Sequence, residues 1–399
     1  MKKVFLLTVS FIVLVIQQNI CAIMLTSHNE GPEDVFKNPA VSAFSQNSWI
    51  FIADYNALDY IYKDDLKLND VKYDFDIETA SEYNSSVSIG NIGSLPGDRK
   101  YVIALSGAQD YMAEYKEQKT EISAAGEVTY STEYDIFPKL SAGFSGKINS
   151  VLSYGVILDT SYQYEYINKK KENPGIVIET TEKNQHVTAG ATFGLYMKSE
   201  EYKSELGFML SSGEITYSKS FKSVDDSSLG QNEKNLINYI EYSASPRIGL
   251  GAFIFLTDSI GIGFEGFMQL PGKYETNFIT DDVPISTEKV VIENSPMVMN
   301  RIIISWSPSE NFGIQSGFSK IYMFNSSHDP DFLYESGSDF DVLSADILFK
   351  YSKNGMSYYA GSTYNHSNFS AKQVQAGQNV DFNVSSHAVK VSVGVGRSY

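Results

Sequence analysis

Hydrophobic and polar residues alternate along this chain with a period of two. The last eleven residues show the pattern clearly, with Val389, Val391, Val393 and Val395 on one face and Lys390, Ser392, Gly394 and Gly396 on the other. The same alternation recurs from Trp49 onward, and no apolar run is long enough to cross a bilayer as a helix. Strands with one apolar and one polar face are typical of a transmembrane barrel. The pattern therefore predicts an all-β fold, a closed antiparallel transmembrane β-barrel.

Alternation bounded by turn residues predicts about fourteen membrane-spanning segments. Most of them reach the roughly ten residues that a tilted strand needs to span the apolar core of a bilayer. Their approximate bounds are 48–62, 71–91, 100–115, 127–147, 151–168, 184–198, 203–222, 236–256, 260–275, 288–306, 312–324, 340–353, 356–368 and 379–399. The count is even, as is general for closed bacterial barrels.

The connections between these segments alternate between tight and long. The tight ones are Asn149-Ser150, 257–259, 307–311 and Asn354-Gly355, and the long polar ones are 169–183, 223–235, 276–287, 325–339 and 370–378. Asn and Gly both tolerate the positive φ that a two-residue hairpin requires, so Asn354-Gly355 is the most specific of these turns. Outer-membrane barrels have short periplasmic turns and long outer loops. We therefore expect both termini in the periplasm of a diderm bacterium.

The polar face of each strand has to line the lumen, because a Lys or Arg facing lipid at mid-depth costs about 2–4 kcal/mol. Ile157 and Phe267 interrupt that polar face. The face assignment predicts a lining of mixed sign, in which the charges either pair with one another or select ions. The predicted lumen residues are Lys139, Lys147, Asp159, Glu165, Glu241, Arg247, Glu265, Arg301, Asp346, Lys350 and Lys390.

The N-terminal region has the organisation of a secretory signal. Residues 1–22 have a basic head, an apolar stretch and a polar end at Ala22, which predicts a cleaved signal peptide. Cys21, the chain's single cysteine, leaves open a lipidated N-terminus as an alternative. The segment 23–47 shows no alternation, and we expect it to fold into the lumen as a short plug ahead of the barrel, 48–399.

Composition and motifs argue against nucleic-acid binding and catalysis. The net charge is −17, whereas phosphate recognition requires a basic face. The five histidines (His28, His186, His328, His366 and His387) are dispersed, so no metal-ligand spacing is present. Gly261–Gly266 matches a dinucleotide-binding spacing but lies within an alternating segment, and no Gly-x-Ser-x-Gly elbow occurs. We therefore expect neither an enzyme nor a bound cofactor or metal.

The segment before the first strand carries Asn38-Pro39-Ala40, followed by small and apolar residues up to Phe44. Proline alone would explain an extended turn here. With the fourteen segments, however, the motif resembles the FadL-like outer-membrane transporters of hydrophobic compounds, whose N-terminal plug carries Asn-Pro-Ala. The resemblance implies that Val395 and the terminal Tyr399 form the signal read by the barrel-insertion machinery. The plug is shorter and the lumen more charged than in the long-chain fatty-acid transporters, which weakens the case for a lipid substrate.

Two functions follow as expectations. The first is an outer-membrane channel, surrounded by outer-membrane lipid, for small solutes, hydrophobic ones among them. The second is a surface-exposed structural or antigenic protein whose loops carry the function, because size and Tyr/Asn richness resemble, more weakly, the variable surface proteins of spirochaetes.

Overall fold

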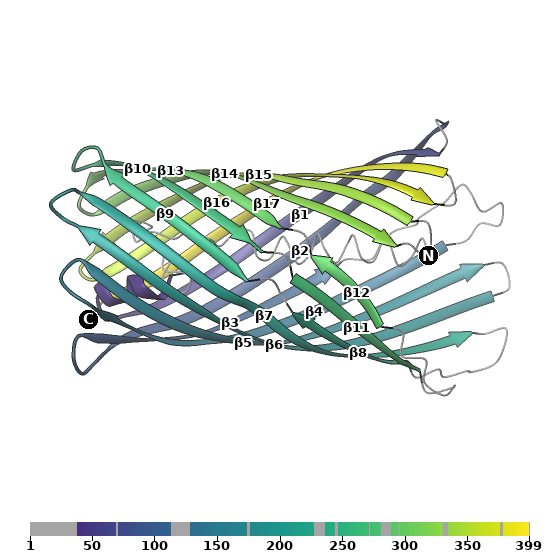
Figure 1. Ribbon diagram of the computed structural model, residues 1–399, viewed down its shortest axis with the longest axis horizontal. Helices are drawn as coiled ribbons and strands as arrows, with labels where there is room; N and C mark the ends of the chain where they lie inside the picture. Colours follow the sequence, from purple (N-terminus) through teal and green to yellow (C-terminus); the bar gives the residue numbers. More distant parts are fainter. Residues whose placement is uncertain are drawn as a thin grey trace.

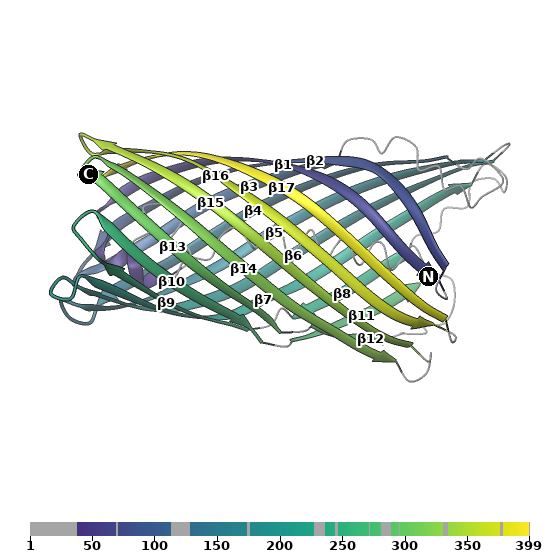
Figure 2. The same cartoon turned by 90° about the horizontal axis from the view of Figure 1, so that it is seen from above.

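The computed structural model describes residues 38–68, 71–112, 128–173, 176–226, 236–243, 246–270, 272–280, 289–294, 296–329, 334–375 and 378–398. These residues form seventeen strands in one antiparallel sheet, which closes because β1 pairs with both β2 and β17. Three of the membrane crossings consist of two strands each. The seventeen strands therefore make a barrel of fourteen crossings, each called a pass below (Figures 1 and 2). The predicted fold is confirmed.

Eleven of the passes described are single strands. Their bounds are β1 Ser48–Leu68, β2 Val71–Leu95, β3 Arg99–Met112, β4 Val128–Lys147, β5 Leu152–Asn173, β6 Ile176–Ser199, β7 Ser204–Asp226, β14 Phe312–Asp329, β15 Tyr334–Lys353, β16 Met356–Gln375 and β17 Gln378–Ser398. A short 3-10 helix, η1, Pro39–Phe44, precedes β1.

The other three passes each consist of two strands. They are β8 Leu236–Ser243 with β9 Arg247–Phe255, β10 Ile260–Gln269 with β11 Gly272–Thr280, and β12 Lys289–Asn294 with β13 Met297–Ser309. Each break coincides with a proline in the sequence: Pro246, Pro271 and Pro296. A proline has no backbone N–H to donate to a ladder, which accounts for the breaks. The alternating pattern predicted each pass as one continuous segment, and it missed these interruptions.

The two faces of the wall differ as the alternation predicts. On β10 the side chains of Ile260, Phe264 and Met268 are exposed, whereas Glu265 and Phe267 between them are buried. The same holds on β17, where Val389, Val391 and Val393 are all about half exposed. The large exposed hydrophobic side chains thus form the outer face of the barrel, and the alternate residues face the lumen.

Tight turns gather at one end of the barrel, on the left of Figure 1, together with η1 and the end of β17. Asn354 (φ 53°) and Gly355 (φ 74°) have the positive φ values predicted for a two-residue hairpin. At the opposite end, three predicted loops were wrong. In 169–183, 325–339 and 370–378 the strands continue as paired hairpins, with Lys169 opposite Thr180 as one example. Backbone pairing needs no alternation where both faces meet water, so the pattern ended before the strands did.

Several predictions fall on residues outside the described ranges. These are the signal peptide 1–22 with Cys21, the plug segment up to residue 37, and the terminal Tyr399. Among the described residues, no helix has both the length and the apolar character needed to traverse a bilayer.

Candidate functional site

The helix η1 lies inside the barrel, at the end where the tight turns gather. Both views of the molecule draw it within the ring of strands (Figures 1 and 2), and Asn38 to Ala43 are buried. Its neighbours are the inner faces of β3, β4, β5 and β6. A short helix therefore occupies part of the lumen cross-section.

Asn38 joins this helix to the wall. Its side-chain amide nitrogen donates to the carbonyl oxygens of Leu195 (3.2 Å) and Phe208 (3.5 Å), which belong to β6 and β7. Its side-chain oxygen accepts from the backbone N–H of Ala40 at 3.1 Å and caps the helix. Pro39 occupies the first helical position, where its missing N–H costs nothing. The Asn-Pro-Ala sequence thus starts the helix and fastens it at the same point.

Two glycines make room for this contact. A Cβ on Gly194 of β6 would overlap the side-chain oxygen of Asn38, and one on Gly155 of β5 would lie 2.5 Å from the carbonyl carbon of Pro39. No side chain fits at such distances. Glycine is therefore required at both positions so that the helix can sit directly against the strand backbone.

Hydroxyl and aromatic groups make the remaining contacts between η1 and the wall, and we call the whole set of contacts the seat of the helix. Ser153 donates to the carbonyl oxygen of Ala40 at 2.8 Å, and Ser42 donates to the hydroxyl of Ser145 at 2.7 Å. Phe44 packs edge to face on Tyr196 of β6, with ring centroids 5.6 Å apart. Lys147, one of the predicted lumen residues, places its ammonium 4.8 Å from the centre of the Phe44 ring.

Apolar side chains cover two parts of the inner wall. One cluster joins β1, β2, β3 and β5, and it contains Ile50, Ile52, Ile92, Val102 and Ile157. The other lies across β7, β10, β13, β14 and β15, and it contains Met209, Phe267, Met297, Met299, Ile321 and Val342, with Met323 packed against it. We call this second group the inner methionine cluster. Ile157 and Phe267, which interrupt the polar face in the sequence, are thus members of these apolar surfaces.

An ionic group borders the inner methionine cluster. Arg301 of β13 donates to both carboxylate oxygens of Asp346 on β15, each at 2.7 Å, and its other terminal nitrogen lies 3.9 Å from Glu265 on β10. Gly317 of β14 lies between, and a Cβ there would come 2.5 Å from the guanidinium. In register, the pair Phe267 and Met299 lies two positions from the pair Glu265 and Arg301, on the same face of β10 and β13. A desolvated ion triad and a thioether-rich patch are therefore neighbours on one wall.

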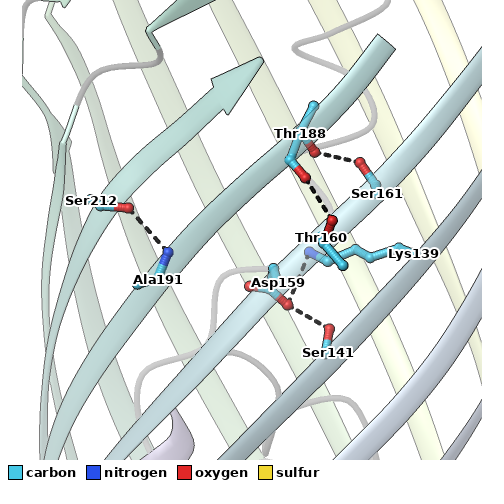
Figure 3. A network of polar contacts seen from close by, with 8 residues as sticks. All are labelled: Lys139, Ser141, Asp159, Thr160, Ser161, Thr188, Ala191 and Ser212. Carbon is cyan, nitrogen blue, oxygen red and sulfur yellow. Dashed lines mark hydrogen bonds and ion pairs between the residues drawn. The ribbon is translucent and has the colours of Figure 1, made fainter. Parts of the chain in front are cut away.

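Two of the predicted lumen lysines form ion pairs elsewhere on the inner wall. Lys390 of β17 contacts Asp54 of β1 at 3.1 Å, and Ser86 of β2 donates to the same carboxylate at 3.1 Å. Figure 3 shows the other, in which the ammonium of Lys139 lies 3.5 Å from Asp159 while Ser141 donates to that carboxylate. Pairing of opposite charges is thus the arrangement found for six of the predicted lumen residues: Lys139, Asp159, Glu265, Arg301, Asp346 and Lys390.

The remaining predicted residues are placed as follows. Glu165 accepts from the amide of Asn184, and Arg247 donates to Gln269 at 3.3 Å. Lys350 lies on β15 in the same alternation as Asp346, and the side chain of Glu241 is outside the described part. Val395 lies near the end of β17. The assignment of these residues to a solute path stays a prediction.

Sequence reasoning missed the residues that hold η1, namely Ser145, Ser153, Gly155, Gly194 and Tyr196. The available signal was a set of small residues on the lumen face of β4, β5 and β6, because small residues on an inner face leave space for another backbone.

Together the closed barrel, its apolar outer face and the helix in its lumen define a membrane-spanning barrel with a partly filled interior. Comparison with solved structures agrees. A FadL homologue of Pseudomonas aeruginosa matches with a TM-score of 0.64 at 12% identity, covering 92% of this chain and 94% of that one. The toluene transporter TodX of P. putida gives 0.63 at 10% identity over 92% and 94%. The monoaromatic hydrocarbon channel CymD gives 0.54 at 11% identity over 96% and 97%.

At this identity the likeness establishes the fold, which is that of the FadL-type barrels, as the strand count and Asn38-Pro39-Ala40 predicted. No protein-family model and no curated protein sequence matches the chain. TodX is a toluene transporter and CymD a monoaromatic hydrocarbon channel, and neither supports the weaker likeness to spirochaete surface proteins.

Proposed function

We propose that this protein is an outer-membrane transporter that carries small hydrophobic solutes through its lumen. The barrel lies in the outer membrane of a diderm bacterium, with the tight turns and both termini in the periplasm, since short turns are periplasmic in such barrels. The similar structures, a toluene transporter and a monoaromatic hydrocarbon channel, support a hydrophobic solute.

The inner methionine cluster is the observation that carries this proposal. The lumen face of a water-filled porin is polar. Here Phe267, Met299 and their neighbours put a contiguous apolar surface on that face. Methionine is flexible and polarisable, so it adapts to apolar and aromatic ligands of different shape. The charged side chains beside this surface form ion pairs with one another. The lumen here therefore attracts free ions less strongly than it would with a ring of unpaired charges of one sign.

We further propose that residues 23–47 close the periplasmic end and that η1 is the attached end of this closure. The support is the seat of Asn38 to Phe44 against β4, β5 and β6, which is made by hydrogen bonds and close backbone contact. A solute leaving the lumen would have to pass beside this helix or displace it.

Two measurements test the proposal. Uptake of a radiolabelled hydrophobic solute should be faster in cells that make the protein than in cells carrying an empty vector. It should fall on Met299→Asp, which places a charge in the apolar cluster, and persist on Met299→Leu, which keeps a similar volume. Equal uptake by all four strains would contradict transport of that solute.

Planar-bilayer recording tests the closure separately. Deletion of residues 23–47 should raise the conductance of the purified barrel, because the lumen is then open at the periplasmic end. An unchanged conductance in a variant that is still folded would show that this segment does not close the pore.

The alternative, a surface protein whose outer loops bind a partner, has no specific observation in its favour. Three of the predicted outer loops are strand hairpins, which leaves less irregular chain for such binding.

A further inference from the structure

Two histidines that are 21 positions apart in the sequence meet on the outer face of the barrel. His366 of β16 and His387 of β17 are direct partners in the antiparallel register. Their rings are stacked, with centroids 4.6 Å apart and planes inclined by 27°. Linear spacing of the histidines predicted no such contact, because a pairing across strands depends on the register and not on the sequence distance.

A tyrosine orients one of the two rings. The hydroxyl of Tyr364 lies 2.6 Å from Nδ1 of His387. When Nδ1 carries the proton, it donates to the phenolic oxygen, and the lone pair of the neutral ring is on Nε2. Metal-binding histidines characteristically donate their other N–H to such an acceptor, which fixes the tautomer and the ring orientation.

The second ring has a nitrogen that lacks a partner. Nδ1 of His366 is buried and makes no hydrogen bond to any residue that the structure describes. A buried polar atom without a partner is costly, and a ligand to this nitrogen would remove that cost. Side-chain torsions to imidazole rings are broad, so modest rotations can bring one nitrogen of each ring to the separation of about 3 Å that a shared metal ion requires.

The pair lies at the edge of the apolar outer surface, away from the tight turns. Along β17 the exposed residues Val389, Val391 and Val393 lie between His387 and the end of the strand. Tyr364 is 45% exposed, as expected for an aromatic residue at a membrane interface.

We propose that His366 and His387 form a binding site for a divalent transition-metal ion, with Tyr364 as the residue that positions His387. Neutral imidazole suits zinc, copper and nickel, whereas calcium and magnesium prefer oxygen ligands. The described side chains contain no group of three or more His, Cys, Asp or Glu that would make a fuller site. However, His387 pairs in register with His366 on one side and with Asp59 of β1 on the other. An acidic residue is therefore the next cross-strand neighbour of the pair.

The test uses the full-length protein in detergent, purified without a histidine tag. Copper(II) is the spectroscopic probe, because its electron paramagnetic resonance spectrum reports the nitrogen atoms that bind it. We expect one copper ion per chain with two imidazole nitrogens, and zinc(II) competing for the same site. His366→Asn and His387→Asn should each remove this spectrum. Tyr364→Phe should weaken binding by about 10- to 100-fold, the usual effect of losing such an orienting partner.

His186→Asn is the matched control. His186 lies on β6, far along the wall from the pair, so its substitution should leave copper binding unchanged. Circular dichroism and heat-dependent gel mobility establish that each variant is a folded barrel. The proposal is overturned if the wild-type protein binds copper no more tightly than the His366→Asn/His387→Asn double variant, or if Tyr364→Phe binds as tightly as wild type.

Discussion

The hydrogen bonds of Asn38 allow a quantitative prediction for the closure of the lumen. Asn38→Ala removes three contacts at once: the two donated to the wall carbonyls of Leu195 and Phe208, and the one accepted from Ala40 within the cap. The cap bond lies within η1, so only the two wall bonds change the balance between the seated and the displaced helix. A protein hydrogen bond contributes about 0.5–1.5 kcal/mol net, so the attachment of η1 to the wall should weaken by about 2 kcal/mol. Because 1.4 kcal/mol is a tenfold change in an equilibrium constant, the ratio of displaced to seated helix should rise about 30-fold.

Single-channel recording in planar bilayers measures this change directly. Asn38→Ala should increase the fraction of time spent in a conducting state towards that of the chain lacking residues 23–47. Asn300→Ala removes an asparagine from the exposed outer face of β13, and it should behave as wild type. If Asn38→Ala conducts like wild type while the deletion conducts freely, the reasoning from these hydrogen bonds is refuted.

Three further substitutions test other parts of the structure. Arg301→Met leaves the carboxylate of Asp346 uncompensated, so it should lower the free energy of unfolding by about 3–5 kcal/mol. Urea titration of the protein in lipid vesicles measures this change, and a loss below about 1 kcal/mol would contradict a desolvated pair. Gly155→Val collides with Pro39 and should raise conductance in the full chain, yet change nothing once residues 23–47 are deleted. Phe267→Asp should reduce hydrophobic-solute uptake whereas Phe267→Leu retains it; equal uptake by both would remove the apolar cluster from the path.

The barrel itself could be predicted because the pattern that determines it is local in the sequence. A two-residue alternation follows directly from strand geometry, and each apolar face has to meet lipid. Where the hairpins extend beyond the membrane, both faces meet water and the alternation is lost. The pattern therefore predicts a loop over 169–183, where the described residues of β5 and β6 are paired.

The interior could be predicted only in part. Charges such as Arg301 and Lys390 could be placed on the lumen face from alternation, but which carboxylate each one meets depends on the register across several strands. Ile157 and Phe267 are exceptions to the polar face in the sequence. Only the closed wall shows that they belong to continuous apolar surfaces, because the neighbours come from distant segments.

The seat of η1 shows the same limit. Asn38-Pro39-Ala40 marked the segment in the sequence, yet the partners of Asn38 are more than 150 positions away. The contact depends on Gly194 lacking a side chain, and no local pattern distinguishes this glycine from the others of the strands.

The most direct test of transport is the initial rate of uptake of radiolabelled toluene by cells that contain the wild-type barrel, the Met299→Asp variant or neither, at matched amounts in the outer membrane. We predict that uptake is faster only in the cells that contain the wild-type barrel. Uptake at the empty-vector rate in cells with the wild-type barrel, or equal uptake with wild type and Met299→Asp, would contradict a hydrophobic path along the inner methionine cluster.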